Sequence, residues 1–299
     1  IQKRKNFRKT FIVLMTTSEV GYSKKILNYL KKRKLDKKFE FLYTPERIFP
    51  SNLFYELVNN NRIIGNNKKK SFKFMKEIFD TFVKGEIIDI DHTSAELIKI
   101  FENTYRNVNI GLANELLKIS LKEKLDIKNL LQAANQHPRV SILNPGIGIG
   151  GHCIPVDPKF LISKYNNIPL IKHSILSNVK HPLFITKKIN SYIIKNNFKN
   201  ILFFCFTYKP NVADFRNSPA IKIVKNIVKL KKSQIFICDP YLSNKIRNTT
   251  TLENNQIYKY KFDLVLLLVA HKIFNINIIK KNEFIDLSGH RNYENINNL

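Results

Sequence analysis

The chain has 299 residues, 43% of them hydrophobic and 25% charged, which is typical of a globular protein with room for two domains. Its formal net charge of +28 attracts anions, but the lysines are spread over every segment and no nucleic-acid-binding motif accompanies them, so a DNA- or RNA-binding protein is not predicted. No apolar run approaches the ~20 residues that span a bilayer, which excludes a membrane-spanning helix.

The first ninety residues alternate patterns typical of strands and helices. These elements are predicted in turn at Lys9–Met15, Ser23–Lys34, Phe39–Tyr43, Arg62–Gly65, Ser71–Val83 and Glu86–Ile90. The alternation predicts a parallel sheet, and strands this short indicate the end of a larger sheet. Thr17 and Glu46 follow predicted strands, at the edge where parallel sheets bind ligands.

A long helix is predicted from Thr93, because apolar residues recur at helical spacing over about eight turns. A capping box is expected at Thr93 or Ser94 with Glu96. A helix this long bridges domains or forms a dimer seam. One polar stripe, which is either a solvated face or part of a site, carries Lys99, Asn103 and Arg106. A second helix, capped by Asp126, is expected to follow.

Four of the nine glycines fall within six positions, at Gly146, Gly148, Gly150 and Gly151. They formally satisfy G-x-G-x-x-G, but a dinucleotide fingerprint needs a helix directly after it and an acidic residue ~20 positions on. Neither is indicated here, so we predict instead a loop in which glycines allow the backbone to approach a ligand closely.

The glycine loop presents a cysteine, Cys153, flanked by His152 and Asp157. This setting favours a nucleophilic thiol over a buried, inert one. Cys205 and Cys238 lie in apolar strand patterns, where the inert role is predicted. The odd cysteine count favours a reducing, cytoplasmic compartment, and no Cys/His spacing predicts a metal site.

A second α/β region is predicted after a helix that follows His181-Pro182. Its elements are expected at Ile201–Phe206, Pro219–Lys229, Gln234–Cys238, Phe262–Val269 and Phe284–Asp286. Continuous apolar strands of this kind predict a doubly wound parallel sheet. The fold class is therefore α/β, with an incomplete Rossmann-like fragment at 1–90, a central helical region at 91–182 and a C-terminal sheet domain at 183–299.

Strings of residues along the chain resemble the UDP-glucose/GDP-mannose dehydrogenase family. They are TTSEVG (16–21), YTPERIFPSN (43–52), RIIGN (62–66), SAELIKIFENTYRNVNIGLANEL (94–116), NQHPRVSILNPGIGIGGHCIPVDP (135–158), FTYKPNVADFRNSPA (206–220) and LLLVAHKIF (266–274). The GGHC-x-P-V-D-P string is highly specific. PERIFP and HPRV are similar to the branch that acts on UDP-N-acetyl-D-mannosamine.

The resemblance implies an NAD-dependent, two-step oxidation of the sugar C6 alcohol to a carboxylate, in which Cys153 forms a thiohemiacetal and then a thioester. Lys99 and Asn103 match the pair that stabilises the oxyanion. Asp157, with Thr17, matches the residues that position water, and Glu46 matches an acid/base carboxylate.

The resemblance also implies binding residues. Lys209 matches a ligand of the substrate phosphate, and Arg216 and Thr17 match cofactor contacts. Arg139 matches an arginine that enters the neighbouring subunit's site, which implies a homodimer through the central helix. The remaining substrate contacts implied are Arg106, Gly146 and Gly150.

Alternatives remain open from the sequence. The substrate is UDP-N-acetylglucosamine in one of them, and in another the chain binds a UDP-sugar without oxidising it. The dinucleotide-binding glycines of the family are not in this chain, so one hypothesis is a separately encoded N-terminal half that supplies them. The pathways implied are those of surface polysaccharides, such as enterobacterial common antigen.

Overall fold

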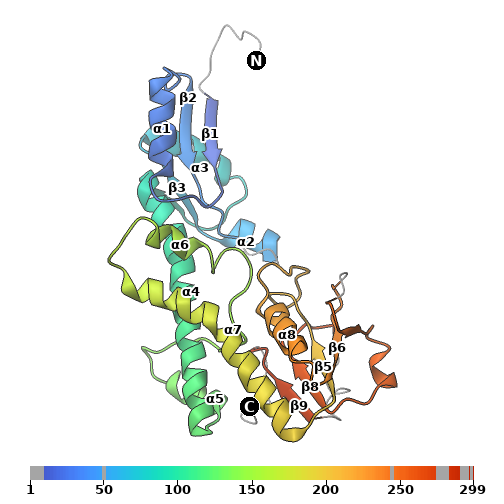
Figure 1. The fold of residues 1–299 in the computed structure, drawn as a ribbon. Helices are drawn as coiled ribbons and strands as arrows, with labels where there is room; N and C mark the ends of the chain where they lie inside the picture. The colour runs from blue at the N-terminus through green and yellow to red at the C-terminus, as the bar shows by residue number, and fades with distance from the viewer. Residues whose placement is uncertain (1–9, 49–51, 243–245, 274–282, 290–295, 297–298) are drawn as a thin grey trace. The chain divides into compact units, whose positions relative to one another are not determined.

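The computed structural model describes residues 10–48, 52–242, 246–273, 283–289, 296 and 299. The chain divides into two compact units (Figure 1). The N-terminal unit comprises residues 1–104 and 157–167, and the C-terminal unit comprises residues 105–156 and 168–299. The predicted three-part boundaries stay a prediction.

The N-terminal unit contains a four-stranded sheet in the order β1-β2-β3-β4. Its strands are β1 (Thr10–Leu14), β2 (Phe39–Tyr43), β3 (Arg62–Gly65) and β4 (Ile87–Ile90). Its first helices are α1 (Tyr22–Lys32), α2 (Leu53–Asn59) and α3 (Lys69–Phe79). Alternate residues of β2 pack on opposite sides, Phe41 and Tyr43 with α1 and Leu42 with α3, so both faces of the sheet are covered.

One junction of this sheet differs from the prediction. β1 pairs with β2, and β3 with β4, in parallel, but β2 and β3 are antiparallel and meet at Tyr43 and Gly65. The connection between them contains α2, which was not predicted and has no buried residue. Antiparallel neighbours need no crossover helix packed on the sheet, so this exposed connection is sufficient.

The long helix α4 (His92–Glu123) is confirmed, but its predicted capping box is wrong. Asp91 caps the start instead, accepting from the Ser94 N–H at 3.0 Å. The Glu96 side chain is fully buried and accepts from the backbone N–H groups of Gly21 and Ser23 at 2.5 and 2.6 Å. A carboxylate at this place complements the positive N-terminus of α1 and fastens α1 to α4.

The helices after α4 are α5 (Ile127–Ala134), α6 (Asp157–Ile162) and α7 (Pro169–Asn196). Asp126 caps α5 as predicted, accepting from the Lys128 N–H at 2.8 Å. A helix starting after His181-Pro182 is wrong, since α7 continues through Pro182. Both residues are buried, so tertiary packing overrides the helix-breaking tendency of proline.

The C-terminal unit contains a wholly parallel sheet, as predicted, in the order β7-β6-β5-β8-β9. The strands are β5 (Asn200–Phe204), β6 (Gln234–Cys238), β7 (Thr250–Thr251), β8 (Leu264–Leu267) and β9 (Glu283–Asp286). α8 (Pro219–Lys229) packs on this sheet (Figure 1) and is capped by Ser218. Residues 201–204 are completely buried, which explains the continuous apolar pattern.

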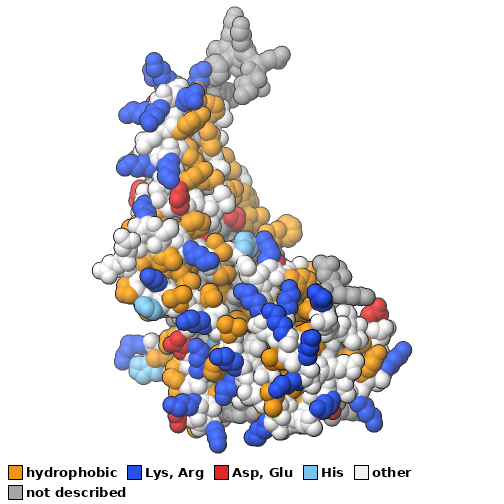
Figure 2. All heavy atoms as spheres, in the orientation of Figure 1, with side chains coloured by type: hydrophobic (Ala, Val, Ile, Leu, Met, Phe, Trp, Pro, Cys, Tyr) orange, Lys and Arg blue, Asp and Glu red, His pale blue; other side chains and the backbone are white. Residues whose placement is uncertain are grey.

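Charge is distributed broadly over the molecule. The face in Figure 2 shows Lys and Arg side chains over many elements and few acidic ones, in keeping with 51 basic and 23 acidic residues. Among the helices of the described residues, none has the length and apolar character that crossing a membrane requires.

Candidate functional site

The predicted site residues divide between the two units. The N-terminal unit holds Thr17, Glu46, Lys99, Asn103 and Asp157. The C-terminal unit holds Arg106, Arg139, Gly146, Gly150, Cys153, Lys209 and Arg216.

The Cys153 thiol is half-buried in a turn closed by a hydrogen bond from the Val156 N–H to the Cys153 carbonyl at 3.1 Å. Its Sγ lies 3.6 Å from Nε2 of His152, within hydrogen-bonding distance for sulfur. An adjacent imidazole is the base that a nucleophilic thiol requires. The local geometry therefore suits Cys153 for attack on an electrophile.

The glycines of the Cys153 loop lie against protein. A Cβ on Gly150 would stand 2.5 Å from Cβ of Tyr208, and one on Gly148 would stand 2.9 Å from Cγ of Pro182. Gly148 also has a φ of +128°, which other residues avoid. At these positions the absence of a side chain allows the loop to pack, and a contact of Gly150 with substrate stays a prediction.

The loop is fastened to the segment that precedes α8. The Gly151 N–H donates to the Arg216 carbonyl at 2.9 Å, and the Asn217 side-chain amide donates to the Gly151 carbonyl at 3.0 Å. Tyr208 of the same segment packs on the loop, and burial raises the pKa of its hydroxyl, with the charges of Asp214 and Cys153 adding to the effect. The thiol and residues 206–217 therefore form one site.

This segment carries two predicted binding residues. Arg216 is exposed, and its guanidinium contacts both carboxylate oxygens of Asp214, the shortest at 2.6 Å. That bond lowers the pKa of the Asp214 carboxyl. Lys209 is half-buried, and its carbonyl accepts from the Thr207 hydroxyl at 2.7 Å.

Two residues missed by the sequence analysis hold the start of the loop. The Gly146 N–H donates to Oδ1 of Asn114 on α4, at 3.0 Å, and the Gly146 carbonyl accepts from Nε2 of His181 on α7, at 2.7 Å. Burial lowers the pKa of His181 to about 4, which keeps the imidazole neutral. The sequence signal that could have identified these two residues is a histidine and an amide on otherwise apolar helix faces.

A third missed residue holds the loop just after the thiol. Asn107 of α4 is buried and donates from Nδ2 to the Ile154 carbonyl at 3.2 Å. Its Oδ1 accepts from the Ser174 hydroxyl of α7 at 3.1 Å. The neighbouring Arg106 is half-buried, whereas Arg139 is exposed.

In the N-terminal unit the predicted polar stripe of α4 meets α6. Asp157 is buried and accepts a hydrogen bond from the side-chain amide of Asn103, which is fully buried. Lys99 lies one turn earlier and is half-buried. Within the described residues the Lys99 ammonium has no hydrogen-bond or ion-pair partner, so it is available to an anion.

The carboxyl ends of β1 and β2 carry the buried hydroxyls of Ser18, Tyr43 and Thr44. Burial raises the pKa of Tyr43, hydrogen bonds with Ser18 oppose this rise, and the charges of Glu96 and Asp157 add to it. The Thr44 hydroxyl has no hydrogen-bond partner among the described residues, and an orphaned buried hydroxyl indicates a place for water or a polar ligand. The half-buried Thr17 lies beside Ser18 in the chain.

Glu46 accepts hydrogen bonds from a side chain and from the backbone. Its Oε1 accepts from Nη1 of Arg62 at 2.9 Å and from the backbone N–H groups of Arg47 and Ile48. The Arg62 side chain is almost completely buried, so this pair is structural as well as polar. A role of Glu46 in acid/base chemistry stays a prediction.

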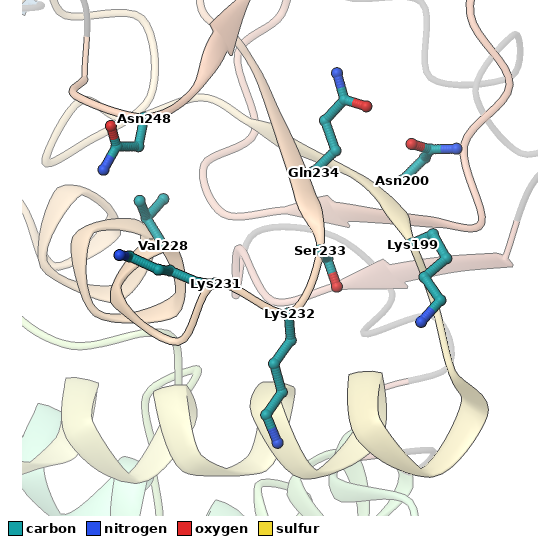
Figure 3. Close-up of a pocket in the computed structure, with 8 residues that line it drawn as sticks. All are labelled: Lys199, Asn200, Val228, Lys231, Lys232, Ser233, Gln234 and Asn248. Atoms are coloured by element: carbon teal, nitrogen blue, oxygen red, sulfur yellow. The ribbon is translucent and has the colours of Figure 1, made fainter.

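A basic pocket of about 600 Å³ lies elsewhere in the C-terminal unit, at the amino ends of β5 and β6 (Figure 3). Its cationic residues are Lys199, Lys231 and Lys232. Among the described residues none of these ammonium groups has an ion-pair partner. The pocket is at the opposite ends of the strands from Lys209, so it is separate from the Cys153 site.

The sequence matches the UDP-glucose/GDP-mannose dehydrogenase family in three stretches. Residues 2–83 match its NAD binding domain, 93–180 its central domain and 202–289 its UDP binding domain.

Several curated relatives are named UDP-N-acetyl-D-mannosamine dehydrogenase, and others are named NDP-N-acetyl-D-galactosaminuronic acid dehydrogenase. A UDP-N-acetyl-D-mannosamine dehydrogenase of Methanocaldococcus jannaschii is 43% identical over 73% of this chain and 50% of its own length. Another, of Campylobacter jejuni, is 33% identical over 88% of this chain and 69% of its own length. The chain thus spans about half the length of the first of these relatives.

Solved structures agree with the sequence comparison. The UDP-D-ManNAc dehydrogenase of Pyrococcus horikoshii superposes with a TM-score of 0.81 at 31% identity, over 93% of this chain and 68% of its own. A UDP-N-acetyl-mannosamine dehydrogenase of Staphylococcus aureus gives 0.80 at 30%, over 95% and 69%. With the three matched domains, the fold and the thiol-bearing glycine loop, this chain belongs to the UDP-glucose/GDP-mannose dehydrogenase family.

Proposed function

We propose that the protein is a dehydrogenase that oxidises the C6 alcohol of UDP-N-acetyl-D-mannosamine to a carboxylate, with NAD as oxidant. One observation carries the proposal: the Cys153 loop is hydrogen-bonded to the segment that contains Lys209 and Arg216. That segment lies in the stretch matching the UDP binding domain. A nucleotide bound to that segment would place its sugar near the Cys153 thiol, which is fixed to the same segment.

The thiol chemistry follows from the local geometry. His152 takes the proton of Cys153, and the thiolate adds to the C6 aldehyde as the carbonyl electron pair moves to oxygen. Oxidation of this thiohemiacetal gives a thioester, which water hydrolyses to the acid and the free thiol. The oxidant would be NAD, one molecule for each of the two hydrides, so that two NAD molecules are consumed in the overall four-electron oxidation of the C6 alcohol through the aldehyde to the acid.

The N-terminal unit supplies the remaining proposed roles. The Lys99 ammonium, which has no partner among the described residues, stabilises the oxyanion through its positive charge. Asn103 holds the Asp157 carboxylate, and Asp157 and Thr17 position water. Burial of Asn103 and Asp157 supports a fixed arrangement, and Glu46 is the proposed acid/base group.

The residues of this chain fit only part of a dinucleotide. The buried Thr44 hydroxyl, which has no hydrogen-bond partner among the described residues, suits a polar group of a ligand. The glycine loop at 146–151 does not form a pyrophosphate cradle, because Gly148 and Gly150 pack on Pro182 and Tyr208 and coil follows them.

We also propose a homodimer through α4 and α7. The α4 side chains of Tyr105, Leu112 and Ile119 are about half exposed or more and are spaced by seven residues, as in a helix–helix seam. α7 adds an exposed apolar stripe at Leu176, Val179 and Leu183. A second copy would bury both stripes, which light scattering of wild type and Leu112→Glu would test.

The function is tested by two measurements on the purified protein. NADH formation is followed with UDP-N-acetyl-D-mannosamine, UDP-N-acetylglucosamine and UDP-glucose, and UDP-sugar binding is followed by calorimetry. Turnover with the first substrate, lost in Cys153→Ser without loss of binding, supports the proposal. Binding without turnover would identify a non-catalytic UDP-sugar-binding protein, and normal acid formation by Cys153→Ser would refute the thiol mechanism.

A further inference from the structure

The carboxyl ends of three adjacent strands of the C-terminal unit bring together a thiol, a carboxylate and an imidazole. β6, β5 and β8 are neighbours, and Asp239, Cys205 and His271 follow them within four residues. One ligand atom of each lies within 4.8 Å of the others, and the three side chains are buried. Such groups bind zinc in other proteins, so this cluster is a candidate metal centre.

The hydrogen bonds around His271 argue against a metal ion. Nδ1 accepts from the Asn211 N–H at 2.8 Å, so it carries no proton. The Thr207 hydroxyl donates to the Lys209 carbonyl, so its oxygen, 3.1 Å from Nε2, accepts. The imidazole proton is therefore on Nε2, the nitrogen 3.8 Å from Asp239. A metal ion would need this nitrogen bare, which would force the proton onto Nδ1 against the Asn211 N–H.

Both oxygens of the Asp239 carboxylate also accept hydrogen bonds. Oδ2 accepts from the Phe206 N–H at 2.5 Å, and Oδ1 accepts from the Tyr241 N–H at 2.7 Å. The imidazole of His271 and Oδ2 of Asp239 thus bond to backbone and hydroxyl groups of the segment that follows β5.

That segment needs such support, because both of its ends are strained. Cys205 and Asn211 have φ values of 65° and 59°, in the left-handed region that is unfavourable for a residue with a Cβ. The imidazole bonds to Thr207 near one end and to Asn211 at the other. The Lys272 N–H adds a bond to Oδ1 of Asn211 at 2.8 Å. Lys209 lies midway between the two residues that the imidazole holds.

We propose that His271 is a positioning residue that fixes the 207–211 segment and so presents Lys209 to the diphosphate of the sugar nucleotide. This inference rests on the proposed function of Lys209 as a phosphate ligand. The neutral imidazole of His271 holds the segment through two hydrogen bonds, accepting at Nδ1 and donating at Nε2. Without the imidazole, a smaller fraction of molecules holds the 207–211 segment in the conformation that binds the diphosphate. The apparent affinity falls in proportion to that fraction.

The experiment measures UDP binding by calorimetry, together with KM and kcat, for five variants. His271→Ala removes both hydrogen bonds and is expected to raise the Kd for UDP at least tenfold and KM with it, with kcat within twofold, since the diphosphate is bound equally before and during reaction. His271→Asn keeps an acceptor near Nδ1 and His271→Gln keeps a donor near Nε2, so the Kd of both variants is expected to lie between those of His271→Ala and wild type.

Lys209→Ala is the reference for loss of the phosphate ligand. Lys232→Ala, from the basic pocket of Figure 3, is the matched control for loss of a positive charge and should leave the Kd unchanged.

The outcomes distinguish the role of Lys209 as a phosphate ligand from the role of His271 as a positioning residue. If Lys209→Ala binds UDP normally, the phosphate ligand of the proposed function is wrong. If Lys209→Ala binds weakly while all three His271 variants bind as wild type, the positioning role is wrong.

Wild type provides a test that does not depend on how the variants fold. Nitrogen-15 NMR of labelled histidine should show His271 as the neutral ring protonated at Nε2, with a signal that shifts when UDP is added. A ring protonated at Nδ1, or one zinc ion bound per chain that His271→Ala loses, would overturn the inference.

Discussion

Gly150→Ala tests whether the glycines of the Cys153 loop serve packing within the protein. The added methyl carbon would stand 2.5 Å from Cβ of Tyr208 and 2.9 Å from Cδ of Pro219, against an ordinary carbon contact of about 3.5–4.0 Å. Relief requires a shift of about 1 Å, and such overpacking costs about 1–3 kcal/mol. Alanine also restricts the unfolded chain, which returns about 0.4–1 kcal/mol. The expected net loss is about 1 kcal/mol.

Gly146→Ala is the matched control in the same loop. The nearest atom to its added methyl is the Ser288 carbonyl oxygen at 3.8 Å, and neither Gly146 nor Gly150 has a positive φ. This variant is therefore expected to be neutral or up to about 1 kcal/mol more stable. Urea unfolding followed by circular dichroism compares the two. Unfolding free energies within 0.5 kcal/mol of each other, on the order of the error of the method, would refute the packing argument.

Further predictions concern the thiols, one histidine and one carboxylate. Iodoacetamide should label Cys153 in the folded protein and leave Cys205 and Cys238 unlabelled by mass spectrometry, since both are buried and burial raises the pKa of Cys238 to about 12. The pKa of His181 is lowered to about 4 in the folded protein, whereas a histidine in the unfolded chain has a pKa of about 6.5. As pH falls, the unfolded chain therefore takes up a proton before the folded protein does. The folding stability present above pH ~6.5 is then lost progressively toward pH ~4, by up to about 3 kcal/mol. His181→Gln, which keeps a donor, should flatten that slope in urea unfolding, and an unchanged slope would contradict the assignment. Glu96→Gln, which turns an acceptor at the start of α1 into a donor, should lower the unfolding free energy by about 2–3 kcal/mol, whereas no change would mean that the cap is not formed.

The elements best predicted from sequence are those whose signal is local. α8 starts at a proline with a serine cap and shows one apolar face, and the prediction matched its ends. β6 was matched equally well, because a continuous apolar run suits a strand covered on both faces. α7 was divided wrongly at Pro182, since the packing that stabilises a proline inside a helix comes from distant residues.

Polar residues inside helices show where local patterns fail. Glu96 has the spacing of a capping box, yet its partners are Gly21 and Ser23, more than seventy positions away. Asn107 and Asn114 bind the loop of Cys153 from positions that a helical pattern marks only as interruptions of an apolar face. A single sequence shows that a buried polar group exists but not which donor or acceptor it meets.

The three cysteines show how surroundings decide the chemistry of one residue type. Cys238 ends a buried strand, where burial and the nearby charge of Asp239 raise its pKa. Cys205 begins the left-handed turn after β5 and is also completely buried. Cys153 alone is partly accessible with an imidazole beside it. Because a thiolate must be both formed and reached by its electrophile, only the third setting meets both conditions, and the hydrogen bonds of Gly146, Gly151 and Ile154 keep it in place.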